Sequence, residues 1–86
     1  MASYRIEFAK SAVKDLRGID RKAVPRILVA VEALADDPRP PRSKKLVGSR
    51  NTYRIRIGDY RVIYKIHDGQ LSIDVIRIRK RGEVYR

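Results

Sequence analysis

The stretch from Tyr53 to His67 reads Tyr-Arg-Ile-Arg-Ile-Gly-Asp-Tyr-Arg-Val-Ile-Tyr-Lys-Ile-His and decides the fold of this chain. Apolar and cationic residues alternate on both sides of Gly58-Asp59, which is typical of two half-buried antiparallel strands joined by a tight turn. With these two residues as the loop, Ile57 pairs with Tyr60. Cross-strand partners share a face of a sheet, so the pattern predicts one apolar face and one cationic face.

The cationic face carries Arg54, Arg56 and Arg61, with Arg56 directly opposite Arg61. Like charges in that relation destabilise a sheet, so stability gives little reason for the arrangement. A polyanion would relieve the repulsion, and planar guanidinium groups suit phosphate. The alternative is a solvated outer face that happens to use arginine. The apolar face can seat a layer of helices, and its members are Tyr53, Ile55, Ile57, Tyr60, Val62, Tyr64 and Ile66.

Length and composition limit the classes of protein to consider. A chain of 86 residues predicts one domain over 1–86, too small for a deep cavity. A net charge of +11 favours a nucleic acid or an acidic protein as partner. The absence of cysteine excludes disulfides and thiolate metal sites. No apolar run is long enough for a membrane span or a signal peptide, so we expect a soluble, cytoplasmic protein without membrane contact.

The segments before the hairpin predict a strand and two helices. Residues 3–8 alternate as a strand, and helical periodicity follows from Ala9 to a stop at Gly18. Asp20 can cap a second helix that ends before Pro38. The proline-rich crossing over 38–52 is expected to be extended and anchored on the core by Leu46. Its cations either extend a basic surface or keep the loop in water; they are Arg42, Lys44 and Lys45.

A second hairpin is predicted at Asp68-Gly69, with His67 paired to Gln70. This register puts residues 71, 73 and 75 on the apolar face and residues 72, 74, 76, 78 and 80 on the arginine face. It also places Asp74 diagonal to Arg61, where a carboxylate could orient the guanidinium group. His67, the single histidine, is predicted at the hairpin tip as a surface residue.

The resulting order β-α-α-β-β-β predicts an α+β fold, in which two N-terminal helices pack on one face of a small, mainly antiparallel sheet. The opposite, cationic face is left open. Function is therefore expected on that face.

Four short motifs resemble the RelE/ParE superfamily of type II toxin–antitoxin toxins, in its RelE-like branch. They are Lys45-Leu-Val-Gly48 upstream of Tyr53-Arg-Ile-Arg56, then Gly58-Asp-Tyr-Arg-Val-Ile-Tyr64, and finally Arg81-Gly-Glu-Val-Tyr85. Length, element order and charge agree over nearly the whole chain. Two departures are visible: the best-studied member has lysines at positions 54 and 56, and many relatives have histidine where this chain has Lys80.

The resemblance implies a ribosome-dependent endoribonuclease that cuts mRNA in the ribosomal A site. The ribose 2′-hydroxyl attacks the adjacent phosphate, so no metal or cofactor is needed. Implied catalytic residues are Arg61, Arg81 and Tyr85, and the implied RNA-binding cations are Arg54, Arg56, Lys44, Lys45 and Lys80. The implied partner is a cognate antitoxin, which could extend to a higher-order toxin–antitoxin complex.

Proton transfer is the open point of this assignment. Arginine does not deprotonate in proteins, so Arg54 and Arg56 cannot replace a lysine as general base. Tyr85, Lys80 with a lowered pKa, or alignment and charge alone remain as alternatives. Two other functions also remain: a ParE-like inhibitor of DNA gyrase and a non-catalytic RNA-binding module.

Overall fold

The computed structural model describes residues 3–80. In chain order the elements are β1 (Arg5–Phe8), α1 (Lys10–Arg17), α2 (Val24–Ala33), β2 (Lys44–Lys45), β3 (Thr52–Ile57), β4 (Tyr60–His67), the single 3-10 turn η1 (Asp68–Gln70) and β5 (Ser72–Lys80). The predicted order is confirmed, with the two-residue β2 as an addition that the sequence did not suggest.

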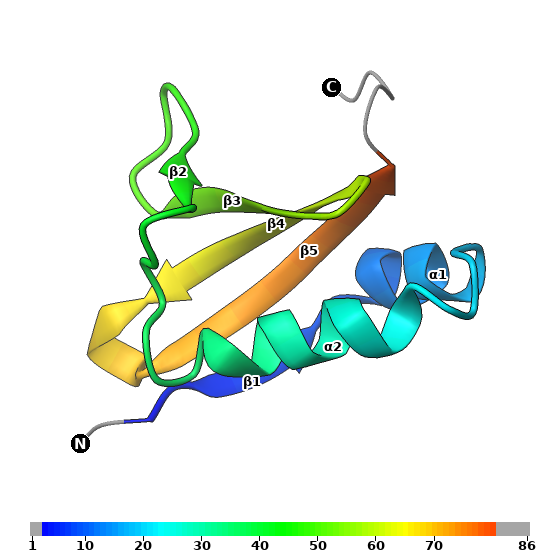
Figure 1. The fold of residues 1–86 in the computed structure, drawn as a ribbon. Helices are drawn as coiled ribbons and strands as arrows, with labels where there is room; N and C mark the ends of the chain where they lie inside the picture. Colours follow the sequence, from blue (N-terminus) through cyan, green and yellow to red (C-terminus); the bar gives the residue numbers. More distant parts are fainter. Residues whose placement is uncertain (1–2, 81–86) are drawn as a thin grey trace.

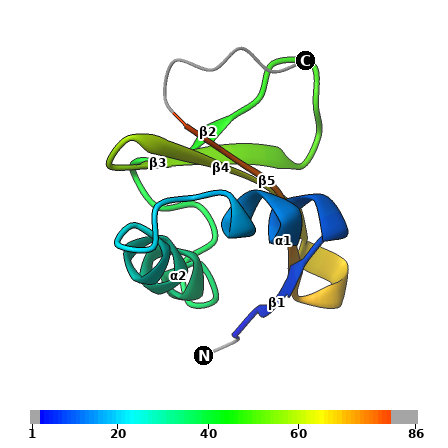
Figure 2. The same ribbon diagram turned by 90° about the vertical axis from the view of Figure 1, so that its right-hand side faces the viewer.

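The strands form one sheet in the order β1-β5-β4-β3-β2, in which only the β1–β5 pair is parallel. Both helices lie on one side of it, and the loop that follows β2 rises on the other (Figures 1 and 2). The β3–β4 register is the predicted one, with Ile57 opposite Tyr60 and Arg56 opposite Arg61. Gly58 has a φ of +58°, which suits glycine at the first position of a two-residue hairpin loop.

Two short helices close the apolar face. Gly18 ends α1 as predicted, and the Asp20 carboxylate accepts a hydrogen bond from the Lys22 N–H at 3.0 Å in the turn before α2. Pro25 is tolerated because it is the second residue of α2, where its missing N–H would have no helical partner. The core between helices and sheet consists of Ala12, Ile27, Val31, Leu34, Ile55, Ile57, Val62, Tyr64, Ile66, Ile73, Val75 and Ile78.

The β4–β5 connection differs from the predicted two-residue turn. The chain makes the 3-10 turn η1, and Leu71 follows in the left-handed region with a φ of +49°. His67 consequently pairs with Ser72 instead of Gln70, and Leu71 is exposed instead of buried. A register shift of two positions leaves each side chain on the same face of the sheet, so Ile73 and Val75 still lie in the core.

A β-bulge in β5 overturns the second half of that prediction. Tyr64 pairs with Val75 and the preceding residue Ile63 pairs with Arg77, which leaves Ile76 as an extra residue. Because side chains alternate between the two faces of a sheet, one extra residue moves every later side chain of the strand to the opposite face. Ile78 therefore pairs with Val62 and is buried in the core, whereas the alternation had assigned it to the arginine face.

Side chains of helix α1 form hydrogen bonds with backbone groups of β5 in the part of the strand that does not pair with β1. The parallel pairing ends at Val75, and the Ser11 hydroxyl then donates a hydrogen bond to the Ile76 carbonyl at 2.6 Å. One carboxylate oxygen of Asp15 accepts from the Ile78 N–H at 2.9 Å. Side chains thus replace a neighbouring strand at this edge, which protects it from pairing with another chain.

A polar cluster ties the crossing after α2 to the β4–β5 turn. The Tyr4 hydroxyl donates to Asp68 Oδ1 at 2.6 Å, and Arg39 Nη2 donates to Asp68 Oδ2 at 2.8 Å. Arg39 also lies over the Tyr53 ring, with Cζ 5.3 Å from the centroid. The Tyr64 hydroxyl donates to the Pro38 carbonyl at 2.8 Å, and burial raises the pKa of Tyr64 to about 12.

The prediction that Leu46 anchors the crossing on the core is wrong. Leu46 is half-buried outside the core cluster, and its N–H donates to the Thr52 carbonyl at 2.9 Å. The polar cluster at Arg39 and the Tyr64 hydroxyl hold the crossing instead. Within residues 3–80, no helix is long and apolar enough to cross a membrane.

The bulge register can be tested by comparing Ile78→Ala with Ile76→Ala. Ile78 is 3% exposed, so its truncation should lower the free energy of unfolding by about 2–5 kcal/mol. Truncation of the half-buried Ile76 should cost clearly less. Urea unfolding measures both. Equal losses, or a larger one for Ile76, would contradict the register.

The Asp68 cluster predicts a pH-dependent contribution to stability. Hydrogen bonds from Arg39 and Tyr4 lower the pKa of Asp68. Its stabilisation is therefore complete above the ordinary aspartate pKa of about 4 and is lost as the pH falls through the lower folded value. The melting temperature of Asp68→Asn should be below wild type at pH 6, and the difference should vanish in acid. Asp36→Asn, which removes an exposed carboxylate elsewhere, is the control; a difference unchanged down to pH 2 would refute the assignment.

Candidate nucleic-acid interface

The predicted cations meet at a hollow beside the β3–β4 hairpin. Arg54 and Arg56 alternate along β3 toward the side of the sheet without helices, and Arg61 joins them from β4. The short β2 adds Lys44, which pairs with Arg54. The hollow has a volume of about 380 Å³ and is lined by Arg42, Lys44, Arg54, Ile55, Arg56, Gly58 and Arg61. Sequence reasoning had foreseen this convergence for Arg54, Arg56, Arg61 and Lys44.

The pairing of strands extends these cations into two rows. Arg56, Arg61 and Arg79 are directly opposite one another on β3, β4 and β5. One step along the strands, Arg54 and Arg77 flank Ile63. We call this surface of Arg54, Arg56, Arg61, Ile63, Arg77 and Arg79 the basic face. Ile63 is only 3% exposed there although it lies outside the core cluster, because long side chains surround it.

An aspartate on α1 balances the charge of Arg77. Its Nε lies 3.2 Å from Asp15 Oδ2, and the Asp15 side chain is only 13% exposed. The same carboxylate accepts the Ile78 N–H. Asp15 therefore joins helix, strand edge and guanidinium in one contact.

The predicted Asp74–Arg61 contact does not form. Asp74 is opposite Lys65, and its Oδ2 lies 3.1 Å from His67 Nε2. Arg61 is opposite Arg79 instead. His67 lies beside the turn as predicted, but with Asp74 as a partner. At about 3.3 Å per residue, it is about 20 Å along β4 from Arg61.

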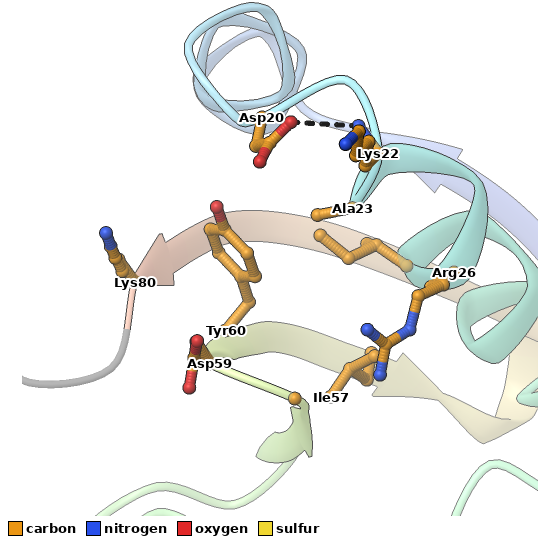
Figure 3. Close-up of a pocket in the computed structure, with 10 residues that line it drawn as sticks. Asp20, Lys22, Ala23, Arg26, Ile57, Asp59, Tyr60 and Lys80 are labelled. Carbon is orange, nitrogen blue, oxygen red and sulfur yellow. Dashed lines mark hydrogen bonds between the residues drawn. The ribbon is translucent and has the colours of Figure 1, made fainter.

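Lys80 lies on the helix side of the sheet, contrary to prediction. The bulge places it opposite Tyr60, and both residues line a cleft of about 280 Å³ that also contains Asp20 and Arg26 (Figure 3). Lys45 is opposite Tyr53, on the other side of the strand from Lys44, and does not line the basic hollow. Neither lysine lines the hollow that contains Arg61.

Two of the three predicted catalytic residues, Arg81 and Tyr85, lie outside the described residues. Among the described ones, the sequence analysis missed Arg79 as a member of the basic face. Its charge was visible in the sequence, but a bulge leaves no sequence signal that would have placed it opposite Arg61. Within residues 3–80, no three His, Cys, Asp or Glu side chains lie close enough together to hold a metal ion.

Comparison with known proteins identifies the family. Residues 6–85 match the family model described as the ParE toxin of the type II toxin–antitoxin system parDE. The chain belongs to the ParE toxin family. Within the wider RelE/ParE superfamily it is RelE-like: it is 33% identical over 91 aligned positions to Toxin RelG of Mycobacterium tuberculosis, with 96% of this chain and 97% of the relative covered.

A second relative and one solved structure support the same placement, and a further solved structure shares the fold. Toxin RelE of M. tuberculosis is 30% identical, with 96% of this chain and 87% of the relative covered. In the crystal structure of the archaeal RelE–RelB complex from Pyrococcus horikoshii, the matching chain is 31% identical with a TM-score of 0.82, over 95% of this ParE-family chain and 99% of that one. The RelBE2 complex of M. tuberculosis, at 24% identity and a TM-score of 0.84 over 96% and 97%, shares the fold.

The basic face predicts a stabilising substitution. Replacing Arg56 by threonine removes a charge directly opposite Arg61 and introduces a residue that favours strands. We expect Arg56→Thr to raise the free energy of unfolding by about 0.2–1 kcal/mol at low salt and by less at high salt. Urea unfolding at two ionic strengths measures this. A loss of stability would indicate that Arg56 supports the fold.

Proposed function

We propose that this RelE-like toxin is a ribosome-dependent endoribonuclease that cuts mRNA in the ribosomal A site. The observation that carries the proposal is the hollow in which Arg54, Arg56 and Arg61 converge with Arg42 and Lys44 on the side of the sheet away from the helices. Such a concentration of guanidinium groups destabilises the free protein and suits a phosphate backbone. Translation in the cytoplasm would be its target.

Cleavage by the 2′-hydroxyl has three demands, which these residues meet to different degrees. The reacting oxygen must be aligned with the leaving oxygen, the charge of the phosphorane must be stabilised, and protons must move. Arg61 is half-buried between strands β3 and β5 and suits the second demand as a preorganised cation. By the family resemblance, Arg81 would share this role.

Proton transfer falls to Tyr85 in this proposal. Arginine cannot act as a base, Lys80 is opposite Tyr60 on the helix side, and His67 is engaged by Asp74 far from Arg61. Tyr85 is the group that the resemblance assigns to the same site. A cationic surrounding would lower its pKa and help it to share a proton.

A cognate antitoxin is the proposed protein partner. The archaeal relative of known structure was solved as a RelE–RelB complex. The net charge of +11 on this chain favours an acidic partner segment, which would bind over the cationic surface and compete with RNA. Co-expression with the product of an adjacent reading frame and co-purification of the pair tests this.

A second candidate is inhibition of DNA gyrase, which the ParE description of the matching family model favours. One experiment, induced expression of the protein, distinguishes mRNA cleavage from gyrase inhibition. Induced expression should halt translation and leave cuts in ribosome-bound transcripts if the protein is a ribonuclease. Intact mRNA together with broken or poorly supercoiled DNA would replace this proposal with gyrase inhibition.

Substitution of Arg61 tests the chemistry. By analogy with the loss of one oxyanion donor, Arg61→Ala should lower the rate of mRNA cleavage on purified ribosomes by about 100- to 1000-fold. Tyr85→Phe should lower it as well if the hydroxyl moves a proton. Arg17→Ala, which removes the same charge from α1, is the control and should retain activity.

Two results would contradict these roles. Full activity of Tyr85→Phe would leave only stacking for the tyrosine ring. Weaker RNA binding by Arg61→Ala without any cleavage by the wild type would make the protein a non-catalytic RNA-binding module.

A further inference from the structure

The bulge puts a third arginine beside the two that the hairpin supplies. Arg79 is directly opposite Arg61, which is directly opposite Arg56. Neighbouring strands are about 4.8 Å apart, so the row is about 10 Å long and crosses the strands nearly at right angles. This length exceeds a single phosphate group. It therefore suits a chain of phosphates better than one isolated anion.

Each end of this row leads to a hollow. At the β3 side, Arg56 and Arg61 line the hollow of about 380 Å³ that also contains Lys44. At the β5 side, Arg79 lines a hollow of about 780 Å³ at the free edge of the strand. Its charged lining residues are the cations Lys14, Arg77, Arg79 and Lys80 and the carboxylates Asp15 and Asp20. The row thus connects two open depressions across the sheet. The first is cationic, and the second is lined by more cations than carboxylates.

Arg77 and Arg79 are the two arginines that β5 adds to the basic face. Arg77 is paired with the half-buried Asp15 carboxylate, at 3.2 Å from Nε to Oδ2, so much of its charge is already balanced inside the protein. Arg79 is directly opposite Arg61 and lengthens the row of guanidinium groups to three. If the pairing continued from Tyr64–Val75 without a bulge, Ile76 and Ile78 would be opposite Ile63 and Arg61 in place of Arg77 and Arg79.

We infer that Arg79 is an additional RNA-binding residue and that single-stranded RNA crosses the strands along the row Arg56–Arg61–Arg79, from the hollow beside β2 to the edge of β5. This inference rests on the proposed function, because it names the path of the RNA over the same basic face. Arg79 contacts the phosphate next to the one held at Arg61. It extends the footprint of the RNA and takes no part in the chemical step.

The test measures binding of a short RNA in which every ribose carries a 2′-O-methyl group, so that no 2′-hydroxyl can attack. Its dissociation constant is determined at several salt concentrations. For Arg79→Ala we expect about tenfold weaker binding at low salt and a salt slope that is shallower by about 0.7, the value for one phosphate contact on a single strand. Arg79→Lys should restore most of the slope because it restores the charge.

Controls separate this role from general charge and from folding. Arg17→Ala carries the same loss of charge on α1 and should leave the slope unchanged. Circular dichroism should show native secondary structure in all variants. If wild type and Arg79→Ala bind with equal slopes, the role of Arg79 is refuted and the proposed function stands. If the folded wild-type protein binds no RNA, the proposed path of the RNA is refuted, whereas the proposed function is refuted only if the wild type also fails to cut mRNA on ribosomes.

Discussion

The extra residue in β5 is the constraint on which the functional surface depends. Up to Val75 the strand alternates as its sequence suggests, with Ile73 and Val75 in the core. Ile76 then has no partner on β4, and the sides of the strand are exchanged. Because of this single insertion, Ile78 completes the core under α1 while Arg77 and Arg79 turn toward Arg61.

Helix α1 makes this bulged strand possible. Beyond Val75 the edge of β5 has no neighbouring strand, and polar backbone groups left unpaired there would be costly. Ser11 and Asp15 supply the missing partners at the Ile76 carbonyl and the Ile78 N–H. Asp15 also holds Arg77, so the helix that covers the core orders one part of the basic face as well.

The two sides of the sheet divide stability from function. The helix side gathers aliphatic residues and Tyr64 into a continuous core, which supplies the free energy of folding. The opposite side places guanidinium groups opposite one another, which opposes folding. Arginine suits this compromise because its aliphatic stem covers apolar surface, as around the buried Ile63, while its planar head remains available to phosphate.

The sequence by itself determined the α+β architecture, the β3–β4 register and the convergence of Arg54, Arg56 and Arg61. These features follow from the local periodicity around Gly58-Asp59, where a two-residue loop allows a single register between β3 and β4. The β4–β5 register, the bulge at Ile76, and hence the sides of Ile78, Arg79 and Lys80, were decided by tertiary structure. The alternation of residues along a strand does not reveal a bulge, because partners distant in sequence stabilise the extra residue. These partners are Ser11 and Asp15 at the edge of the strand and the core that accepts Ile78.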